Sequence, residues 1–182
     1  MGNLPAKMIR ISRVPSLDAE LLAQLTEIYA RAYRDEPLYA EQGLKRIRRY
    51  LKWLFRHARG AFWVARAGRD PVGFLALEEM EPVPEIHEIA VDPEWQGKNV
   101  ARKLMQEALN YLKEKGYARV GLWVGEHNLR AQRFYQRLGF VPGERVGIWL
   151  RMEKDLQPDR ASSSNTRKAV STSEREILSS GV

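Results

Sequence analysis

The stretch Val91–Leu104, VDPEWQGKNVARKL, is the strongest indication of the fold. An apolar strand ends at its start, a turn of small and polar residues follows, and a helix begins near Asn99 or Val100. The first N–H groups of a helix have no intrahelical partner, and the helix dipole favours negative charge beside them. Gly97 lets the backbone approach a ligand closely. The turn is therefore suited to binding phosphate.

The side chains of this turn add donors and positive charge. Gln96, Lys98 and Arg102 surround its backbone, and Ala101 is small enough for close approach. This chemistry fits a pyrophosphate, although an ordinary strand-to-helix turn has a similar composition. Asn99 occupies a position where a phosphate-binding loop usually has glycine, and Asn is the next most tolerant residue of positive φ.

A second motif follows the next strand, at Asn128–Phe140, NLRAQRFYQRLGF. Taken singly, Asn128 is a helix cap, Phe134 and Leu138 are core residues, and Tyr135 is a packed ring. Their combination as N-x-x-A-x-x-F-Y-x-x-L-G-F is more specific than any one of them.

Hydrophobic periodicity predicts the other elements. Helices are predicted from a cap at Ser16 as far as Pro37, and over 41–59, 100–115 and 128–138. Strands are predicted over 8–14, twice within 61–80 around a turn at 68–71, and over 85–91, 118–124 and 146–152. The order β-α-α-β-β-β-α-β-α-β predicts a mixed sheet with helices on both faces.

Composition indicates one globular domain over 1–156, followed by a Ser/Thr-rich tail, 157–182, that we expect to be disordered. The 182 residues contain no cysteine, which excludes disulfides, cysteine metal sites and a cysteine nucleophile. We expect a cytoplasmic protein, because no apolar run is long enough to span a membrane and the start lacks a signal peptide. His57, His87 and His127 are scattered, so no metal site is expected.

Positive charge is concentrated in one segment, Leu44–Arg59, LKRIRRYLKWLFRHAR, within a chain of net charge +7. A run of this kind is usually a solvated helix face. Nucleic acid is therefore not expected as a partner, although this segment is the place where it would bind.

The two motifs resemble those of the GNAT superfamily of acyl-CoA N-acyltransferases. The resemblance covers Ile9 to about Met152 and is densest from Glu85 to Phe140. It implies an α/β (α+β) fold with about four helices, built on a splayed, mixed, mostly antiparallel sheet of six or seven strands. It also implies an N-acetyltransferase that uses acetyl-CoA as cosubstrate and requires no metal.

The resemblance also implies which residues bind coenzyme A. The family's Q/R-x-x-G-x-G/A turn binds the pyrophosphate, the preceding strand pairs with the pantetheine arm, and the Asn and Tyr of the second motif lie further along it. We expect Asn99 to weaken this binding without abolishing the site. The implied set is Ile89, Ala90, Val91, Gln96, Gly97, Lys98, Asn99, Val100, Ala101, Arg102, Asn128 and Tyr135.

The implied mechanism is direct attack of an amine on the thioester, with Tyr135 protonating the leaving thiolate. The general base is not determined by the sequence. Some relatives have a Glu where this chain has Trp123, and histone-type relatives have one that matches Glu85. His87 and Glu88 are the other candidates, and strand alternation predicts Glu88 on the face opposite to Glu85 and His87.

The acceptor is expected to be an amine-bearing small molecule or a peptide, bound near the first two helices. This region supplies Tyr29, Tyr33, 34–42 and Trp149, and it includes Trp123 if the strand faces that way. A homodimer that pairs the late strands is compatible with the apolar 146–152 segment. The alternative is a non-catalytic acyl-CoA-binding or interaction module on the same fold.

Overall fold

The structure is a computed structural model that describes residues 8–157, so the predicted tail lies outside the described residues except for its first position. The strands are β1 Ile9–Arg13, β2 Phe62–Ala67, β3 Asp70–Glu78, β4 Glu85–Val91, β5 Arg119–Gly125, β6 Val141–Val146 and β7 Trp149–Asp155. The α-helices are α1 Ala19–Ala32, α2 Leu44–Ala58, α3 Val100–Glu114 and α4 Leu129–Arg137, with short 3-10 turns at Pro37–Tyr39 and Pro93–Trp95.

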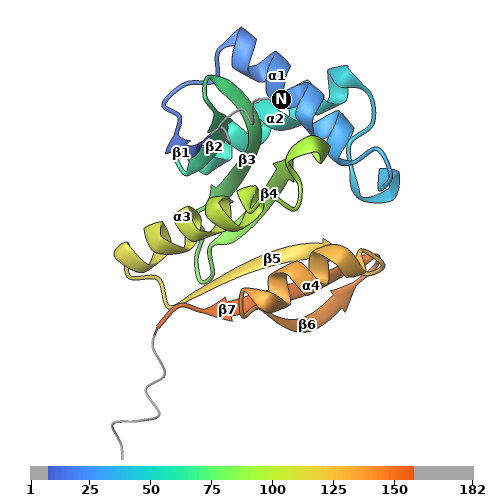
Figure 1. The fold of residues 1–182 in the computed structure, drawn as a ribbon. Coiled ribbons are helices and arrows are strands. Elements are labelled where there is room, and N and C mark those ends of the chain that lie inside the picture. Colours follow the sequence, from blue (N-terminus) through green and yellow to red (C-terminus); the bar gives the residue numbers. More distant parts are fainter. Residues whose placement is uncertain (1–7, 158–182) are drawn as a thin grey trace, which may run out of the picture.

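The strands form one seven-stranded sheet in the order β1-β2-β3-β4-β5-β7-β6. Every neighbouring pair is antiparallel except β4 and β5, which are parallel. That pair is short, since only Glu85 with Gly121 and Ile86 with Leu122 lie in register. Beyond them the two strands diverge, and the sheet opens between β4 and the β5–β7–β6 part (Figure 1). The predicted splayed sheet is therefore confirmed.

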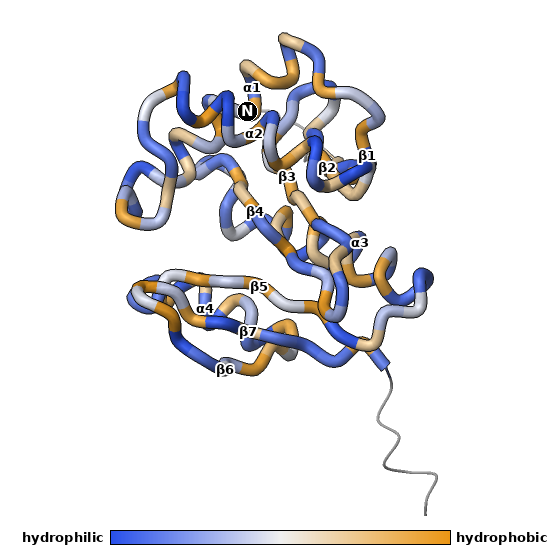
Figure 2. The backbone as a smooth tube through the Cα atoms, turned by 180° about the vertical axis from the view of Figure 1, so that it is seen from behind, coloured by the Kyte–Doolittle hydropathy of each residue, from blue (hydrophilic) through white to orange (hydrophobic). Residues whose placement is uncertain are grey.

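Apolar side chains form a separate core on each face of the sheet. On one face α1 and α2 pack against residues such as Phe62 and Phe74. On the other face α3 and α4 pack against residues such as Leu75 and Leu122. Figure 2 shows from behind that β4 and β5 are separated, with the β5–β7–β6 part of the sheet on one side of the opening and the rest of the sheet on the other.

A β-bulge in β4 changes the direction of its side chains. Ala76 pairs with Glu88, but Leu77 pairs with Ile86, so His87 is an extra residue on β4. His87 consequently contacts Trp53 of α2, and Glu88 also points toward α1 and α2. The prediction that His87 and Glu88 lie on opposite faces is wrong, because it assumed an unbroken alternation.

The C-terminal part contains a strand that the sequence analysis did not predict. β6 and β7 form a hairpin around Gly147, whose φ is 58°. Pro142 and Gly143 make the β6 sequence look like a loop, which is why the strand was missed. Since β7 is paired with both β5 and β6, it offers no free edge for the strand-paired dimer suggested above.

Two helix starts also differ from the prediction. Asp18 rather than Ser16 caps α1, because the Asp18 side chain accepts a hydrogen bond from the N–H of Leu21. The 3-10 turn at Pro37–Tyr39 occupies part of the connection, so α2 begins at Leu44 instead of residue 41.

Candidate active site

The turn between β4 and α3 has the geometry of an anion site. Gly97 and Asn99 have φ values of 75° and 68°, both in the left-handed region. Asn99 is the N-cap of α3 but makes no side-chain capping hydrogen bond. The N–H groups at the start of α3 and at Gly97 make no hydrogen bond to any residue in 8–157; they belong to Gly97, Asn99, Val100, Ala101 and Arg102. These free donors fit the doubly charged pyrophosphate of coenzyme A.

Side-chain contacts hold this turn in place. Arg31 of α1 forms an ion pair with the buried carboxylate of Asp92, the first residue after β4. The Gln96 amide donates to the Val91 carbonyl at 3.1 Å. Lys98 is exposed, with its ammonium 4.9 Å from the ring centre of Trp95. The turn is thus fixed by α1 and β4, while its backbone donors stay available.

The segment Ile89–Val91 borders the opening in the sheet. It is paired with β3 on one side, but its other side lies beyond the two positions at which β4 meets β5. Among the described residues no strand pairs with that side. The backbone there can hydrogen-bond an extended ligand in the manner of an added strand.

Glu88 is a buried carboxylate surrounded by tyrosine hydroxyls. Its side chain is 8% exposed. Tyr33 donates to one carboxylate oxygen at 2.5 Å, and Tyr50 donates to the other at 3.1 Å. Burial raises the pKa of Glu88 to about 7, and the hydrogen bonds from Tyr33, Tyr50 and the Ile89 backbone oppose the rise only in part.

Tyr135 lies near Glu88 but belongs to the core on the opposite face of the sheet. Its ring packs edge-on against Phe134 and Phe140 in the core beneath α4. Burial, and then the negative charge of Glu88, raise the pKa of the Tyr135 hydroxyl above its ordinary value. Tyr135 is therefore protonated at neutral pH. It is also close enough to Glu88 to respond to the charge on that carboxylate.

Asn128 places α4 relative to β5. Its side-chain oxygen accepts a hydrogen bond from the N–H of Ala131 at 3.0 Å, as predicted for a helix cap. The Gln132 amide donates to the carbonyls of Gly125 and Glu126, both at 2.9 Å. These bonds fix the helix that positions Tyr135.

Glu85 and His87 belong to a charge-compensated network close to Glu88 on the same strand. Arg151 of β7 lies 2.6 Å from a Glu85 oxygen and also contacts Glu153. His87 lies between Glu78, at 2.6 Å, and Glu85, at 3.4 Å. Both candidates therefore contact charged side chains, whereas the hydrogen-bond partners of Glu88 are the neutral hydroxyls of Tyr33 and Tyr50.

Aromatic rings line the part of the opening where we expect the amine acceptor to bind. Tyr39, from the α1–α2 connection, packs against Trp149 with ring centres 5.5 Å apart. Its hydroxyl accepts a hydrogen bond from the His127 N–H at 3.1 Å. Trp123 pairs in register with Arg151, whose guanidinium lies 5.3 Å from its ring centre. Trp123 and Trp149 therefore share the sheet face that Tyr39 covers.

Four contacts of this site were not expected from the sequence. They are the bonds of Tyr33 and Tyr50 to Glu88, the Arg31–Asp92 ion pair and the seat of Tyr39 on Gly125. Only the first predicted helix contained a sequence signal for such contacts. Tyr29 and Tyr33 lie on its apolar face, and each carries a hydroxyl that needs a hydrogen-bond partner when it is buried. The partner of each ring comes from a distant element and leaves no trace in local sequence.

The fold and this site together define an acyl-CoA-dependent acyltransferase. Residues 22–140 match the family model described as acetyltransferase (GNAT) family. An uncharacterised N-acetyltransferase of Methanocaldococcus jannaschii is 37% identical over 156 residues, covering 82% of this chain and 69% of that protein. Another, from Archaeoglobus fulgidus, is 35% identical over 125 residues, covering 65% of this chain and 85% of that one.

Solved structures agree with these matches. A Pyrococcus horikoshii protein is 34% identical with a TM-score of 0.75, covering 81% of this chain and 98% of its own. The PaiA N-acetyltransferase of Thermoplasma acidophilum, solved in complex with coenzyme A, shares the fold at 24% identity and a TM-score of 0.69, covering 81% of this chain and 99% of its own. The chain belongs to the GNAT family and is an acetyl-CoA-dependent N-acetyltransferase.

Two further kinds of feature are absent from residues 8–157. None of the helices described there is both long and apolar enough to cross a membrane. No group of three or more His, Cys, Asp or Glu side chains in that range is arranged to hold a metal ion. The cytoplasmic location stays a prediction.

Proposed function

We propose that the protein transfers the acetyl group of acetyl-CoA to a primary amine by direct attack within a ternary complex, with Glu88 as general base and Tyr135 as general acid. The observation that supports this most strongly is the buried Glu88 carboxyl, whose pKa burial raises to about 7. A carboxyl of that pKa is about half ionised at pH 7, and its ionised form accepts a proton well. An amine arrives as an ammonium ion and must lose a proton before it can attack.

Acetyl-CoA would lie along the opening in the sheet. The free N–H groups between Gly97 and Arg102 would hold the pyrophosphate, with Lys98 and Arg102 adding positive charge. The pantetheine arm would pair with Ile89–Val91 on the side that faces away from β3. A backbone N–H of this segment would then stabilise the oxyanion of the tetrahedral intermediate.

The two proton transfers are linked by the charge on Glu88. Glu88 takes a proton from the ammonium, the amine nitrogen bonds to the carbonyl carbon, and the carbon–sulfur bond then breaks. Tyr135 gives its proton to the departing thiolate, and the Tyr135 phenolate then takes the surplus proton from the acylated nitrogen, so that a neutral amide and coenzyme A leave and Glu88 keeps the one proton released. The negative charge of Glu88 is one of the two causes that raise the pKa of Tyr135. Once Glu88 is protonated, that cause disappears, and Tyr135 becomes a stronger acid at the step that needs it.

The acceptor would be an amine-bearing small molecule or a peptide amine. Tyr33 and Tyr50 surround the carboxylate, and Tyr39, Trp123 and Trp149 lie on the facing part of the sheet. Aromatic faces and a carboxylate are the groups that attract an ammonium ion.

Release of free coenzyme A, followed with a thiol reagent over a panel of amines, tests the proposal. The panel should include polyamines, amino acid amides and short peptides. The expected result is release that depends on one class of amine and falls in Glu88→Gln and Tyr135→Phe. If release depends on an amine but neither variant changes it, Glu88 and Tyr135 are not the base and the acid.

A further inference from the structure

Helix α2 presents three different faces to its surroundings. Its apolar residues Ile47, Leu51, Leu54 and Ala58 are buried in the core. About a quarter-turn away, Tyr50 donates a hydrogen bond to Glu88, and Trp53 contacts His87 edge-to-face. The face opposite the core consists of basic side chains, and the acetyl transfer described above does not use it.

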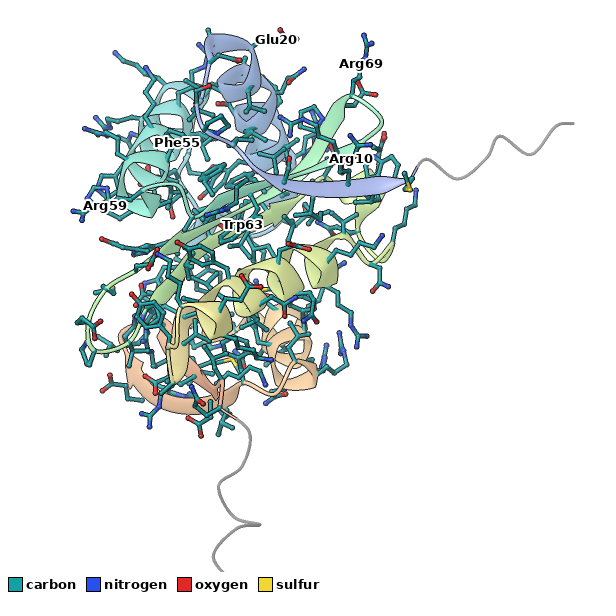
Figure 3. The ribbon with its side chains drawn as sticks, turned by 90° about the vertical axis from the view of Figure 1, so that its left-hand side faces the viewer. Arg10, Glu20, Phe55, Arg59, Trp63 and Arg69 are labelled. Atoms are coloured by element: carbon teal, nitrogen blue, oxygen red, sulfur yellow. The ribbon has the colours of Figure 1, made fainter. Side chains whose placement is uncertain are left out.

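These basic residues form a continuous line, which we call the basic ridge. Five of them follow one another at intervals of four and three residues, the spacing that keeps side chains on one helix face. They are Lys45, Arg49, Lys52, Arg56 and Arg59, with Arg46 and Arg48 alongside. All seven are exposed. Figure 3 shows Arg59 and other nitrogen-tipped side chains of α2 projecting away from the sheet.

The ridge is not neutralised within the described part of the protein. None of its side chains forms an ion pair with a carboxylate in residues 8–157. The segment 44–59 contains seven basic residues and no acidic one. The other 23 basic residues of the chain are matched by its 23 acidic residues, so this segment accounts for the entire net charge of +7. A solvated helix face usually mixes both signs of charge.

We propose that the basic ridge binds the phosphodiester backbone of nucleic acid without selecting bases. The ridge from Lys45 to Arg59 is about 21 Å long, over which one strand of a duplex presents about six phosphates. Five of its seven cations are arginines, whose planar guanidinium groups pair with phosphate oxygens through two hydrogen bonds.

Other anionic partners fit this surface less well. A membrane-surface helix needs large apolar side chains next to its cations, and the exposed apolar residue of α2 is Leu44, at its first position. A stable protein interface needs apolar or aromatic anchors at its centre, and the ridge has only cations there. Phosphate contacts alone are sufficient for sequence-independent binding of nucleic acid.

Fluorescence anisotropy with a labelled mixed-sequence RNA of about 20 nucleotides, and with a duplex DNA of similar length, tests the proposal. We expect micromolar binding at about 50 mM salt that weakens steeply as salt rises. Arg49→Glu/Lys52→Glu/Arg56→Glu should weaken binding by about tenfold or more. The milder triple change to Gln should reduce the slope of log affinity against log salt by about 2, since three phosphate contacts are lost.

The matched control is Arg10→Glu/Arg69→Glu/Lys113→Glu, which removes the same charge at exposed positions outside α2. It should leave most of the binding intact. Both triple variants should acetylate a small amine at the wild-type rate, because the ridge does not line the pocket, and thermal melts should show that they fold.

Three results would overturn the proposal. They are no binding by the wild-type protein, an equal loss in the control variant, or tighter binding to polyglutamate or to vesicles rich in anionic lipid than to RNA and DNA. If the wild-type protein binds RNA but acetylates no amine, that result counts against the catalytic proposal alone.

Discussion

Tyr33, the C-cap residue of α1, donates a hydrogen bond to the carboxylate of Glu88 on β4, across 55 residues of sequence. Tyr50 on α2 donates to the second oxygen. The contacts connect both helices to the strand that borders the opening in the sheet. They also provide a buried charge with partners, without which it would be strongly destabilising. The pKa of Glu88 is therefore a property of the packed helices as well as of the residue itself.

Replacing Glu88 by Gln should lower kcat by about 10²- to 10⁴-fold, the usual contribution of a general base. In the wild-type protein kcat/KM should rise with pH up to about 7 and then level, because the carboxyl must be ionised to accept a proton and burial raises its pKa to about 7. In Glu88→Gln the rise of kcat/KM up to about pH 7 should be absent, and the only remaining pH dependence should come from ionisation of the amine substrate. Initial rates at saturating acetyl-CoA between pH 5 and 9 measure both effects.

The matched control for this prediction is Glu85→Gln. Glu85 is paired with Arg151 at 2.6 Å, so its loss should lower kcat by less than about tenfold. Equal losses in the two variants, or a pH limb that persists in Glu88→Gln, would show that the base lies elsewhere.

The same carboxyl should make stability depend on pH. Its pKa is raised from 4.5 to about 7 in the folded protein, so folding favours the protonated form. This stabilisation is complete below about pH 4.5 and is lost as pH rises to about 7. Glu88→Gln does not titrate and should therefore be more stable than the wild type at pH 8, by about 1–3 kcal/mol, and similar to it at pH 5. Urea unfolding at both values checks this, and a variant that is less stable at pH 8 contradicts it.

Tyr135→Phe separates the role of the hydroxyl from that of the ring. The ring contacts with Phe134 and Phe140 remain, so the fold and the KM for acetyl-CoA should change little. The rate should fall by about 10²-fold, because the thiolate must leave without a proton donor. Tyr117→Phe is the control, since the Tyr117 hydroxyl bonds Glu79 and takes no part in the proposed transfer. Unchanged turnover in Tyr135→Phe would exclude it as the acid.

The elements of the fold were largely predictable because their signals are local. The apolar spacing of 100–115 and the cap at Asn128 depend on residues within a few positions, and the structure has helices at both places. The left-handed conformation of Asn99 was likewise suggested by the residue type alone. The resemblance to the family added the splayed, mixed and mostly antiparallel character of the sheet, which periodicity does not determine.

The details that decide chemistry were not predictable in this way. The bulge at His87 depends on the pairing of β4 with β3, and no residue of 85–91 signals it. The raised pKa of Glu88 depends on burial by helices that are distant in sequence. Both Glu85 and Glu88 lie on one short strand, and nothing in the local sequence shows which of them the helices bury. The choice between Glu85 and Glu88 therefore required the tertiary structure.

Asn99 provides a test of the pyrophosphate turn. Its φ of 68° lies in the left-handed region, which glycine adopts freely and asparagine tolerates better than most other residues. Asn99→Gly should therefore change the Kd for coenzyme A by less than about threefold, whereas Asn99→Val, which is β-branched, should weaken binding by about tenfold or more. Isothermal titration calorimetry measures both. Equal binding by the Gly and Val variants would mean that this turn does not hold the cofactor.

Gly125 provides the last test, because it positions an acceptor wall without touching the cofactor turn. A β-carbon at Gly125 would lie 2.4–2.6 Å from ring atoms of Tyr39, so Gly125→Ala must displace that ring. The hydrogen bond from the His127 N–H to the Tyr39 hydroxyl should then be lost, and with it the link between the α1–α2 connection and the start of α4.

The expected consequence of Gly125→Ala is a rise in the KM for the amine of about tenfold, with the Kd for coenzyme A unchanged, since the Tyr39 wall shapes only the acceptor side. Gly143→Ala is the matched control, because a β-carbon there would meet its nearest atom at 3.8 Å, an ordinary contact. Steady-state kinetics with the best amine and calorimetry with coenzyme A separate the two effects. An unchanged amine KM would show that Tyr39 lies outside the acceptor path, and a parallel loss of coenzyme A affinity would show that the displacement reaches α4.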